Sequence, residues 1–340
     1  MFGLSDLAVP IIGAPMAGGP GTPALAAAVS NAGGLGFLAA GYLTAEKFAD
    51  GIAAVRAATT GPIGVNLFVP QPSLADRAAL DRYREELTPL AESYGTAPGR
   101  THPDDDAWDA KIDVVADTAP EMASFTFGCP SAETLARLRK RGVLTAVTVT
   151  SLDEAGIAVG AGADALVVQG PEAGGHRGTF DPGRRPGEEP LDSLLSAIGS
   201  AHDIPVIAAG GLTSASDVRR ALGHGARAAQ FGTALLLADE AGTNPVHRQA
   251  LSDPQFTHTV VTCAFSGRYA RGLANGFTDR YDPVAPLGYP EVNQLTGAVR
   301  RAAIAAGDPH GTNLWAGTAW RRIRGGAAAD IVAALAQEVA

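Results

Sequence analysis

The clearest indication of the fold is the stretch Val167-Val-Gln-Gly-Pro-Glu-Ala-Gly-Gly-His-Arg-Gly178. It begins as an apolar, β-branched run, typical of a strand buried on both faces, and it ends in a glycine-rich loop. Two further runs, Ile204–Leu212 and Ala228–Ala234, also pass from apolar residues into glycine. Strands of this kind that alternate with helices predict a parallel sheet.

The same alternation extends outward along the chain and predicts eight strands. Alanine-rich stretches of helical length separate them, and Thr22, Thr44, Ser131 and Ser151 stand where helix N-caps are expected. Eight repeats favour a closed (β/α)8 TIM barrel of the α/β class, although an open doubly wound sheet has the same periodicity. The predicted strands are Pro10–Ala14, Gly34–Ala39, Ile63–Phe68, Met122–Phe127, Leu144–Thr148, Ala165–Gln169, Val206–Ala209 and Ala228–Phe231.

The chain is longer than a plain barrel needs. It has 340 residues, against roughly 250 for a typical barrel. We assign residues 1–240 to the barrel, with a polar insertion at about 70–120 that holds one or two extra helices. Residues 241–301 are predicted to form a smaller, partly helical region that covers the barrel mouth, and residues 302–340 a C-terminal helical segment that returns to the barrel.

The charge and hydrophobicity of the chain indicate which kinds of binding partner to expect. The net charge is −9 and the longest basic run is the three residues Arg139-Lys140-Arg141, a pattern that argues against nucleic-acid binding. No apolar run approaches the roughly 18 residues of a membrane span. The first basic residue is Lys47, so no secretory signal is predicted. We therefore expect a cytoplasmic protein that acts on a small molecule and binds neither nucleic acid nor membranes.

The sequence predicts no metal site. Cys129 and Cys263 lack any metal-ligand spacing and are interpreted as small buried hydrophobes. There is no HExxH motif, no Walker loop and no GxSxG elbow, and Gly33-Gly-Leu-Gly36 precedes a strand instead of following one. Chemistry based on an organic cofactor is what remains.

His176 is the predicted catalytic residue. It follows the carboxyl end of a strand, where barrel enzymes carry their catalytic groups. Gly174 and Gly175 lack Cβ atoms and would let the backbone approach a flat ligand. An imidazole with a pKa near neutrality suits a general base. The alternative is a loop histidine hydrogen-bonded to backbone, the role assigned to the other histidines, which lack a glycine cradle.

The ends of the last two strands form the predicted phosphate site. Gly210, Gly211, Gly232 and Thr233 offer amides and a hydroxyl without bulky side chains, at the two strands where barrels bind phosphate. A single Gly-Gly after a strand could equally start a helix. The joint position of the two ends favours phosphate.

Two further residues are candidate cofactor contacts. Met16 lies in a tight turn after the first strand and could lie against a flat ring, but a core methionine in an ordinary turn explains it equally well. Asn66 stands near the end of an apolar strand. If it is buried it needs a partner, such as a phosphate or a ring edge.

Seven motifs follow one another along nearly the whole chain: Gly13-Ala-Pro-Met-Ala-Gly-Gly19, Asn31-Ala-Gly-Gly-Leu-Gly36, Val65-Asn-Leu-Phe68, Gln169–Gly178, Ala208-Ala-Gly-Gly211, Gln230-Phe-Gly-Thr233 and Ser266-Gly-Arg-Tyr-Ala-Arg-Gly272. In this order they resemble the nitronate monooxygenases, formerly called 2-nitropropane dioxygenases, which are FMN-dependent TIM barrels.

The resemblance implies a role for individual residues. His176 matches the base that takes a proton from the carbon beside the nitro group, after which the reduced flavin reacts with O2 to give a carbonyl compound and nitrite. The phosphate is expected at Gly211 and at Gln230, Phe231, Gly232 and Thr233. The FMN ring and ribityl chain are expected against Ala14, Pro15, Met16, Asn66, Gln169 and Gly174.

One departure leaves the substrate open. Thr126 stands where some relatives carry a second histidine beside the flavin. The substrate could be a nitronate, such as propionate 3-nitronate, or a neutral nitroalkane. The superfamily also includes enoyl-acyl-carrier-protein reductase II and NADH:quinone reductases, so an FMN-dependent NAD(P)H reductase is the second interpretation and a non-catalytic flavin-binding protein the third. Oligomeric state is left open, with a homodimer as one option.

Overall fold

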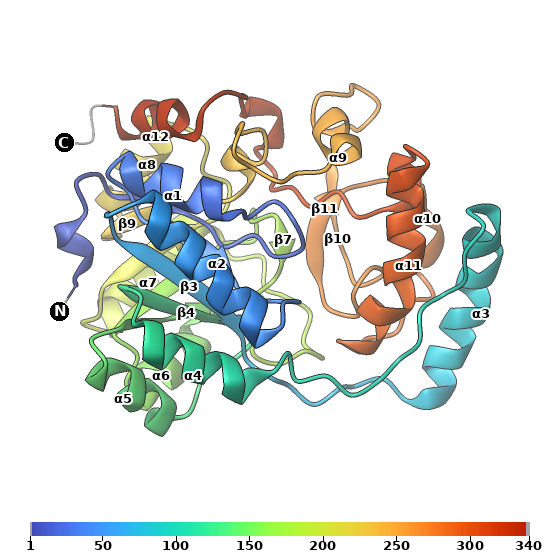
Figure 1. Cartoon of the computed structure of the whole chain (residues 1–340), viewed down its shortest axis with the longest axis horizontal. Coiled ribbons are helices and arrows are strands. Elements are labelled where there is room, and N and C mark those ends of the chain that lie inside the picture. Colours follow the sequence, from blue (N-terminus) through green and yellow to red (C-terminus); the bar gives the residue numbers. More distant parts are fainter. Residues whose placement is uncertain (1, 338–340) are drawn as a thin grey trace.

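The computed structural model describes residues 2–337, and within them eight parallel strands form a barrel (Figure 1). Neighbouring strands follow the order β1-β9-β8-β6-β5-β4-β3-β2, and Leu35, just before β2, bridges Ile12 of β1. This bridge nearly closes the sheet, so the TIM-barrel prediction is confirmed and the open sheet was wrong. The strands are β1 (Ile11–Gly13), β2 (Gly36–Ala39), β3 (Ile63–Phe68), β4 (Met122–Thr126), β5 (Leu144–Val149), β6 (Ala165–Gln169), β8 (Val206–Ala209) and β9 (Ala228–Phe231).

The barrel interior is apolar and packed near the starts of the strands. Ile12 and Ile207 belong to this inner cluster, which Leu4 of the short helix η1 (Leu4–Asp6) also joins. Ile11, the neighbour of Ile12, belongs instead to a second cluster between the sheet and the helices. This alternation is expected for strands buried on both faces. A filled base leaves the carboxyl ends of the strands for a binding site.

Helices surround the sheet where the sequence predicts them. Thr22, Thr44, Ser131 and Ser151 each accept a hydrogen bond from a backbone N–H in the first turn of the following helix, so the predicted caps are confirmed. The surrounding helices are α1 (Pro23–Asn31), α2 (Ala45–Ala58), α4 (Trp108–Thr118), α5 (Ala132–Lys140), α6 (Leu152–Ala161), α7 (Leu191–Ala201), α8 (Ala215–Gly223) and α12 (Ala328–Ala336). Across residues 2–337, no helix has both the length and the apolar character that a membrane crossing requires.

A smaller unit sits beside the barrel mouth, on the right of Figure 1. We call α3 (Arg77–Ser93) and residues 245–317 the covering unit. Tyr83 and Leu87 of α3 pack with Phe265 and Phe277 in its core, although α3 belongs to the insertion near residue 70. The other elements are α9 (Pro245–Ala250), β10 (Thr259–Thr262), β11 (Ala270–Leu273), α10 (Gly276–Tyr281), α11 (Glu291–Ala305) and η3 (Pro309–Gly311).

One strand that joins the barrel to the covering unit was not predicted from the sequence. β7 (Gly175–His176) leaves the barrel after β6 and pairs antiparallel with β11, with His176 opposite Ala270. The predicted catalytic loop is therefore part of the small sheet β10-β11-β7 of the covering unit. The domain boundaries at residues 240 and 301 stay predictions.

Candidate active site

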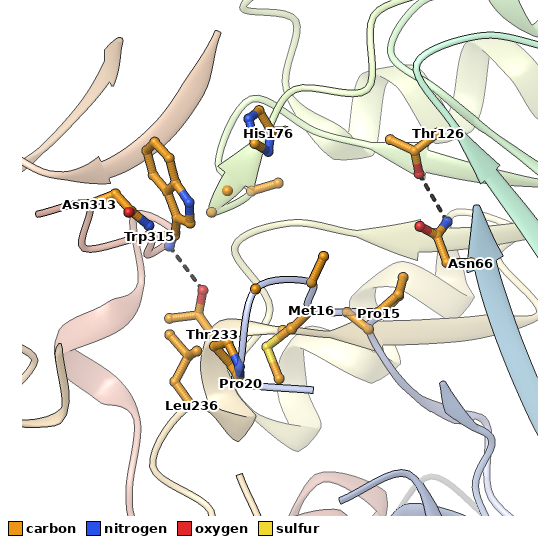
Figure 2. Close-up of a pocket in the computed structure, with 18 of the residues that line it drawn as sticks. Pro15, Met16, Pro20, Asn66, Thr126, His176, Thr233, Leu236, Asn313 and Trp315 are labelled. Carbon is orange, nitrogen blue, oxygen red and sulfur yellow. Dashed lines mark hydrogen bonds between the residues drawn. The ribbon is translucent and has the colours of Figure 1, made fainter. Parts of the chain in front are cut away.

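A cavity of about 630 Å³ lies at the carboxyl ends of the barrel strands, between the barrel and the covering unit. Figure 2 shows Pro15 and Met16 between Asn66 and Thr233, with His176 and Trp315 on the opposite side. A cavity of this size is in the range of sites that bind cofactors and small ligands. The predicted site residues that line it are Ala14, Pro15, Met16, Asn66, Gln169, Gly174, Gly175, His176, Gly210, Gly211, Gln230, Gly232 and Thr233.

Phe231 is the predicted residue that does not line the cavity. Its side chain is 1% exposed and packs in the cluster between the sheet and the helices. Side chains alternate along a strand, so Gln230 faces the interior and Phe231 faces outward. The Phe231 carbonyl accepts a hydrogen bond from Ala14 N–H at 2.8 Å, which fixes the end of β1.

Asn66 finds its partners inside the protein. Its Nδ2 donates to Ser124 Oγ at 2.9 Å and to Thr126 Oγ1 at 3.0 Å, the second bond being drawn in Figure 2. The partner that a buried Asn66 needs is therefore supplied by the protein for the amide nitrogen. Thr126 lines the cavity and orients Asn66.

Gly174 and Gly175 serve different purposes. A Cβ on Gly174 would collide with the backbone of Ala316 and Gly317. This glycine therefore allows the covering unit to pack closely against the loop. Making room for a ligand is not its main effect. Gly175 has φ +76°, a conformation that favours glycine, and a Cβ there would meet open space.

The glycines at the predicted phosphate end of the cavity differ in their surroundings. Gly210 and Gly211 have positive φ, and a Cβ on them would press against Ala173 and Glu172, whereas a Cβ on Gly232 would reach only ordinary contact with Ala14 Cβ (3.5 Å) and Met16 Sδ (3.9 Å). Gln230 Oε1 is buried and lacks a hydrogen-bond partner in the described chain. Such an orphaned acceptor beside a glycine cradle fits a bound ligand with N–H or O–H donors.

Gln169 holds the loop that carries His176. Its Nε2 donates to the His176 carbonyl at 3.0 Å, and its Oε1 accepts from Gly178 N–H at 2.9 Å and Arg177 Nε at 3.1 Å. The side chain was predicted as a cofactor contact. Although it lines the cavity, its hydrogen bonds position the loop that carries His176.

The tautomer of His176 follows from its partners. Nε2 lies 2.8 Å from Ser266 Oγ, and this hydroxyl donates to the Arg268 carbonyl at 3.1 Å. Because the hydroxyl proton is used, Ser266 accepts the ring N–H at Nε2. Nδ1 is then the ring atom that can accept a proton. The rings of Phe127, Tyr289 and Trp315 surround the imidazole at centroid distances of 5.5, 6.2 and 5.7 Å.

The expected near-neutral pKa of His176 was wrong. Burial lowers the pKa of His176 to about 3, and the positive charges of Arg268 and Arg300 act in the same direction. The half-buried ring is accessible from the cavity, while the surrounding aromatic side chains shield it from bulk water. His176 is therefore a neutral imidazole throughout the physiological pH range.

Sequence reasoning missed the cavity residues of the covering unit. Ser266 lies in a motif noted only for its resemblance, and Arg300, Asn313 and Trp315 carry no strand or glycine pattern. Tyr42 follows β2 and could have been found, because barrel sites draw on the loop after every strand.

The comparisons agree with the geometry. The family model described as nitronate monooxygenase matches residues 3–338. A nitronate monooxygenase of Paraburkholderia phytofirmans is 40% identical over 338 residues, covering 97% of this chain and 92% of the relative. One from Pseudomonas aeruginosa is 40% identical over 340 residues, covering 97% and 96%.

A solved structure is also similar. The crystal structure of nitroalkane oxidase from Streptomyces ansochromogenes superimposes with a TM-score of 0.94 at 45% identity, covering 98% of this chain and 96% of that one. Because the family model matches nearly the whole chain and the relatives are 40–45% identical, this chain belongs to the nitronate monooxygenase family of flavin-dependent oxidoreductases.

Proposed function

We propose that this chain is a cytoplasmic, FMN-dependent enzyme that oxidises alkyl nitronates or nitroalkanes with O2 to a carbonyl compound and nitrite. The observation that carries the proposal is a neutral His176, held by Ser266, in the same cavity as the unpartnered Gln230 Oε1. A base and a cofactor cradle in one cavity fit proton abstraction followed by oxidation.

The residues present fit FMN. Gly210, Gly211, Gly232 and Thr233 would hold one phosphate group, and Ala14 to Met16 would lie against the ring. When bound, FMN would supply the redox chemistry that links oxidation of the substrate to O2. Gln230 Oε1 would accept a hydrogen bond from the cofactor.

His176 would act on neutral nitroalkanes. The unprotonated Nδ1 would take the α-proton, while Ser266 keeps the ring N–H on Nε2 and fixes the ring orientation. Phe127, Tyr289 and Trp315 would exclude water from the developing anion. A preformed nitronate has already lost this proton and would not need the base.

Anaerobic mixing tests the proposal against its alternatives. Propyl-1-nitronate should bleach the flavin absorbance of the purified holoenzyme, whereas NADH and NADPH should reduce the flavin far more slowly. Rapid, saturable reduction by NADH without any response to nitronate would favour the reductase. A flavin that responds to neither would favour a non-catalytic flavin-binding protein.

Gly232→Val should impair FMN binding without unfolding the barrel. The Gly232 φ of −103° suits any residue, and the added methyl groups would enter the cavity. We expect FMN binding at least about tenfold weaker, the equivalent of one lost hydrogen bond. Circular dichroism and chromatography of the released flavin measure the two properties. Gly187→Val, at an exposed glycine with open space around it, is the control. Full FMN content in Gly232→Val would contradict the placement.

His176→Asn should separate the two substrate forms. Removing a positioned base costs about 10²–10⁴-fold in rate, and only the neutral nitroalkane needs that base. The variant should keep FMN and retain a larger fraction of its activity on propyl-1-nitronate. Oxygen consumption with both forms measures this, with His258→Asn as an exposed control. Equal losses on both forms would assign His176 to binding instead of proton abstraction.

The pH profile should lack a histidine titration near neutrality. Because the pKa of His176 is lowered to about 3, the base is already unprotonated at pH 5. The kcat/KM for freshly diluted nitroalkane should stay level between pH 5 and 7 and fall only as pH approaches the lowered pKa. A rise centred near the ordinary histidine value of about 6.5 would show that the ring is protonated in the free enzyme.

A further inference from the structure

Arg300 on α11 lines the cavity and has no role in the proposed function so far. Neutral oxygens hold its guanidinium. Nε donates to Thr296 Oγ1 at 3.1 Å and Nη1 to Asn313 Oδ1 at 3.0 Å. Nη2 donates to the carbonyl and to Oδ1 of Asn293 at 3.1 and 2.7 Å. These bonds fix the orientation of the guanidinium and leave its charge uncompensated.

No carboxylate balances this charge in the described part of the chain. None of the ion pairs among residues 2–337 includes Arg300, and the adjacent charged side chain on α11 is another cation, Arg301. The charge of Arg300 also acts on His176, so both groups influence the same cavity. A desolvated cation without a counter-ion is unfavourable unless a ligand supplies one.

One donor is left for that ligand. A guanidinium has five N–H groups, and the four hydrogen bonds to Thr296, Asn293 and Asn313 leave one N–H on Nη1. The complementary group is an anion that presents an oxygen to this single N–H. Nitronates and carboxylates both do so, because their two oxygens share one negative charge.

We propose that Arg300 binds a planar two-oxygen anion of the substrate, either the nitronate group itself or a carboxylate elsewhere on the same molecule. The inference rests on the proposed function, because it places this anion in the cavity of His176. It assigns substrate recognition to α11 of the covering unit, whereas the proposed FMN contacts come from the barrel.

An equilibrium measurement tests the anion site without turnover. Calorimetry with propionate and propionamide compares two molecules of similar size, of which only propionate is charged. The FMN-loaded wild type should bind propionate roughly 10- to 100-fold more tightly, as expected for a hydrogen bond to a charged group. Arg300→Gln should lose this preference. Arg280→Gln removes an exposed charge outside the cavity and should keep it.

Kinetics then distinguish the two sources of the anion. If Arg300→Gln lowers kcat/KM equally for propyl-1-nitronate and propionate 3-nitronate, the guanidinium binds the nitronate group. If only propionate 3-nitronate is affected, it binds the carboxylate. Arg300→Lys should recover part of either loss, because it restores the charge without the hydrogen bonds that orient the guanidinium.

Three outcomes would overturn the proposal. The first is equal affinity of the wild type for propionate and propionamide, which decides the matter even if Arg300→Gln fails to fold. The second is an unchanged kcat/KM of Arg300→Gln on both nitronates. The third is loss of FMN from Arg300→Gln, which would assign Arg300 to the cofactor. Because calorimetry needs no turnover, a protein that binds propionate through Arg300 but oxidises no nitronate would refute only the proposed function.

Discussion

The site depends on one loop that is held from two sides. From the barrel, the Gln169 side chain binds the backbone of His176 and Gly178. From the covering unit, β11 pairs with β7 and places Ala270 opposite His176. Neither contact alone would fix the imidazole, because loops after barrel strands are otherwise mobile. Barrel and covering unit must therefore both be in place before His176 faces the cavity.

The same arrangement sets the electrostatics. Arg177, Arg268 and Arg300 lie close to the loop or cavity, and none of the three is in an ion pair within residues 2–337. Arg268 lies over the Phe127 ring, 4.1 Å from its centroid, and Phe127 in turn packs edge-on against His176. Desolvated cations weaken the fold, but they favour a neutral imidazole and an anion beside it. A cavity built this way favours an anionic ligand.

The barrel could be predicted from the sequence because the patterns that identify its strands are local. Apolar runs that end in glycine identify strands and their carboxyl ends without knowledge of the rest of the chain, which is why Gly211 and Gly232 were placed at the cavity. The sequence also allows the prediction that the Phe231 side chain points away from the cavity, since it alternates with Gln230 on β9. The lowered pKa of His176 could not be predicted from the sequence, because the burial of the ring and its proximity to Arg300 arise from segments far apart in sequence.

The barrel and the covering unit contribute different residues to the cavity. Apart from Gly175 on β7, the predicted cofactor contacts lie in the barrel. Of the cavity residues that sequence reasoning missed, Ser266, Arg300, Asn313 and Trp315 come from the covering unit. Gly174 lies where the two parts meet, because its missing side chain lets Ala316 and Gly317 approach the loop that carries His176. Six of the seven motifs that resemble the family lie in the barrel part of the chain, and the seventh, Ser266–Gly272, lies in the covering unit. The missed side chains Arg300, Asn313 and Trp315 take their positions only from the packed covering unit, which is why local sequence patterns do not reveal them.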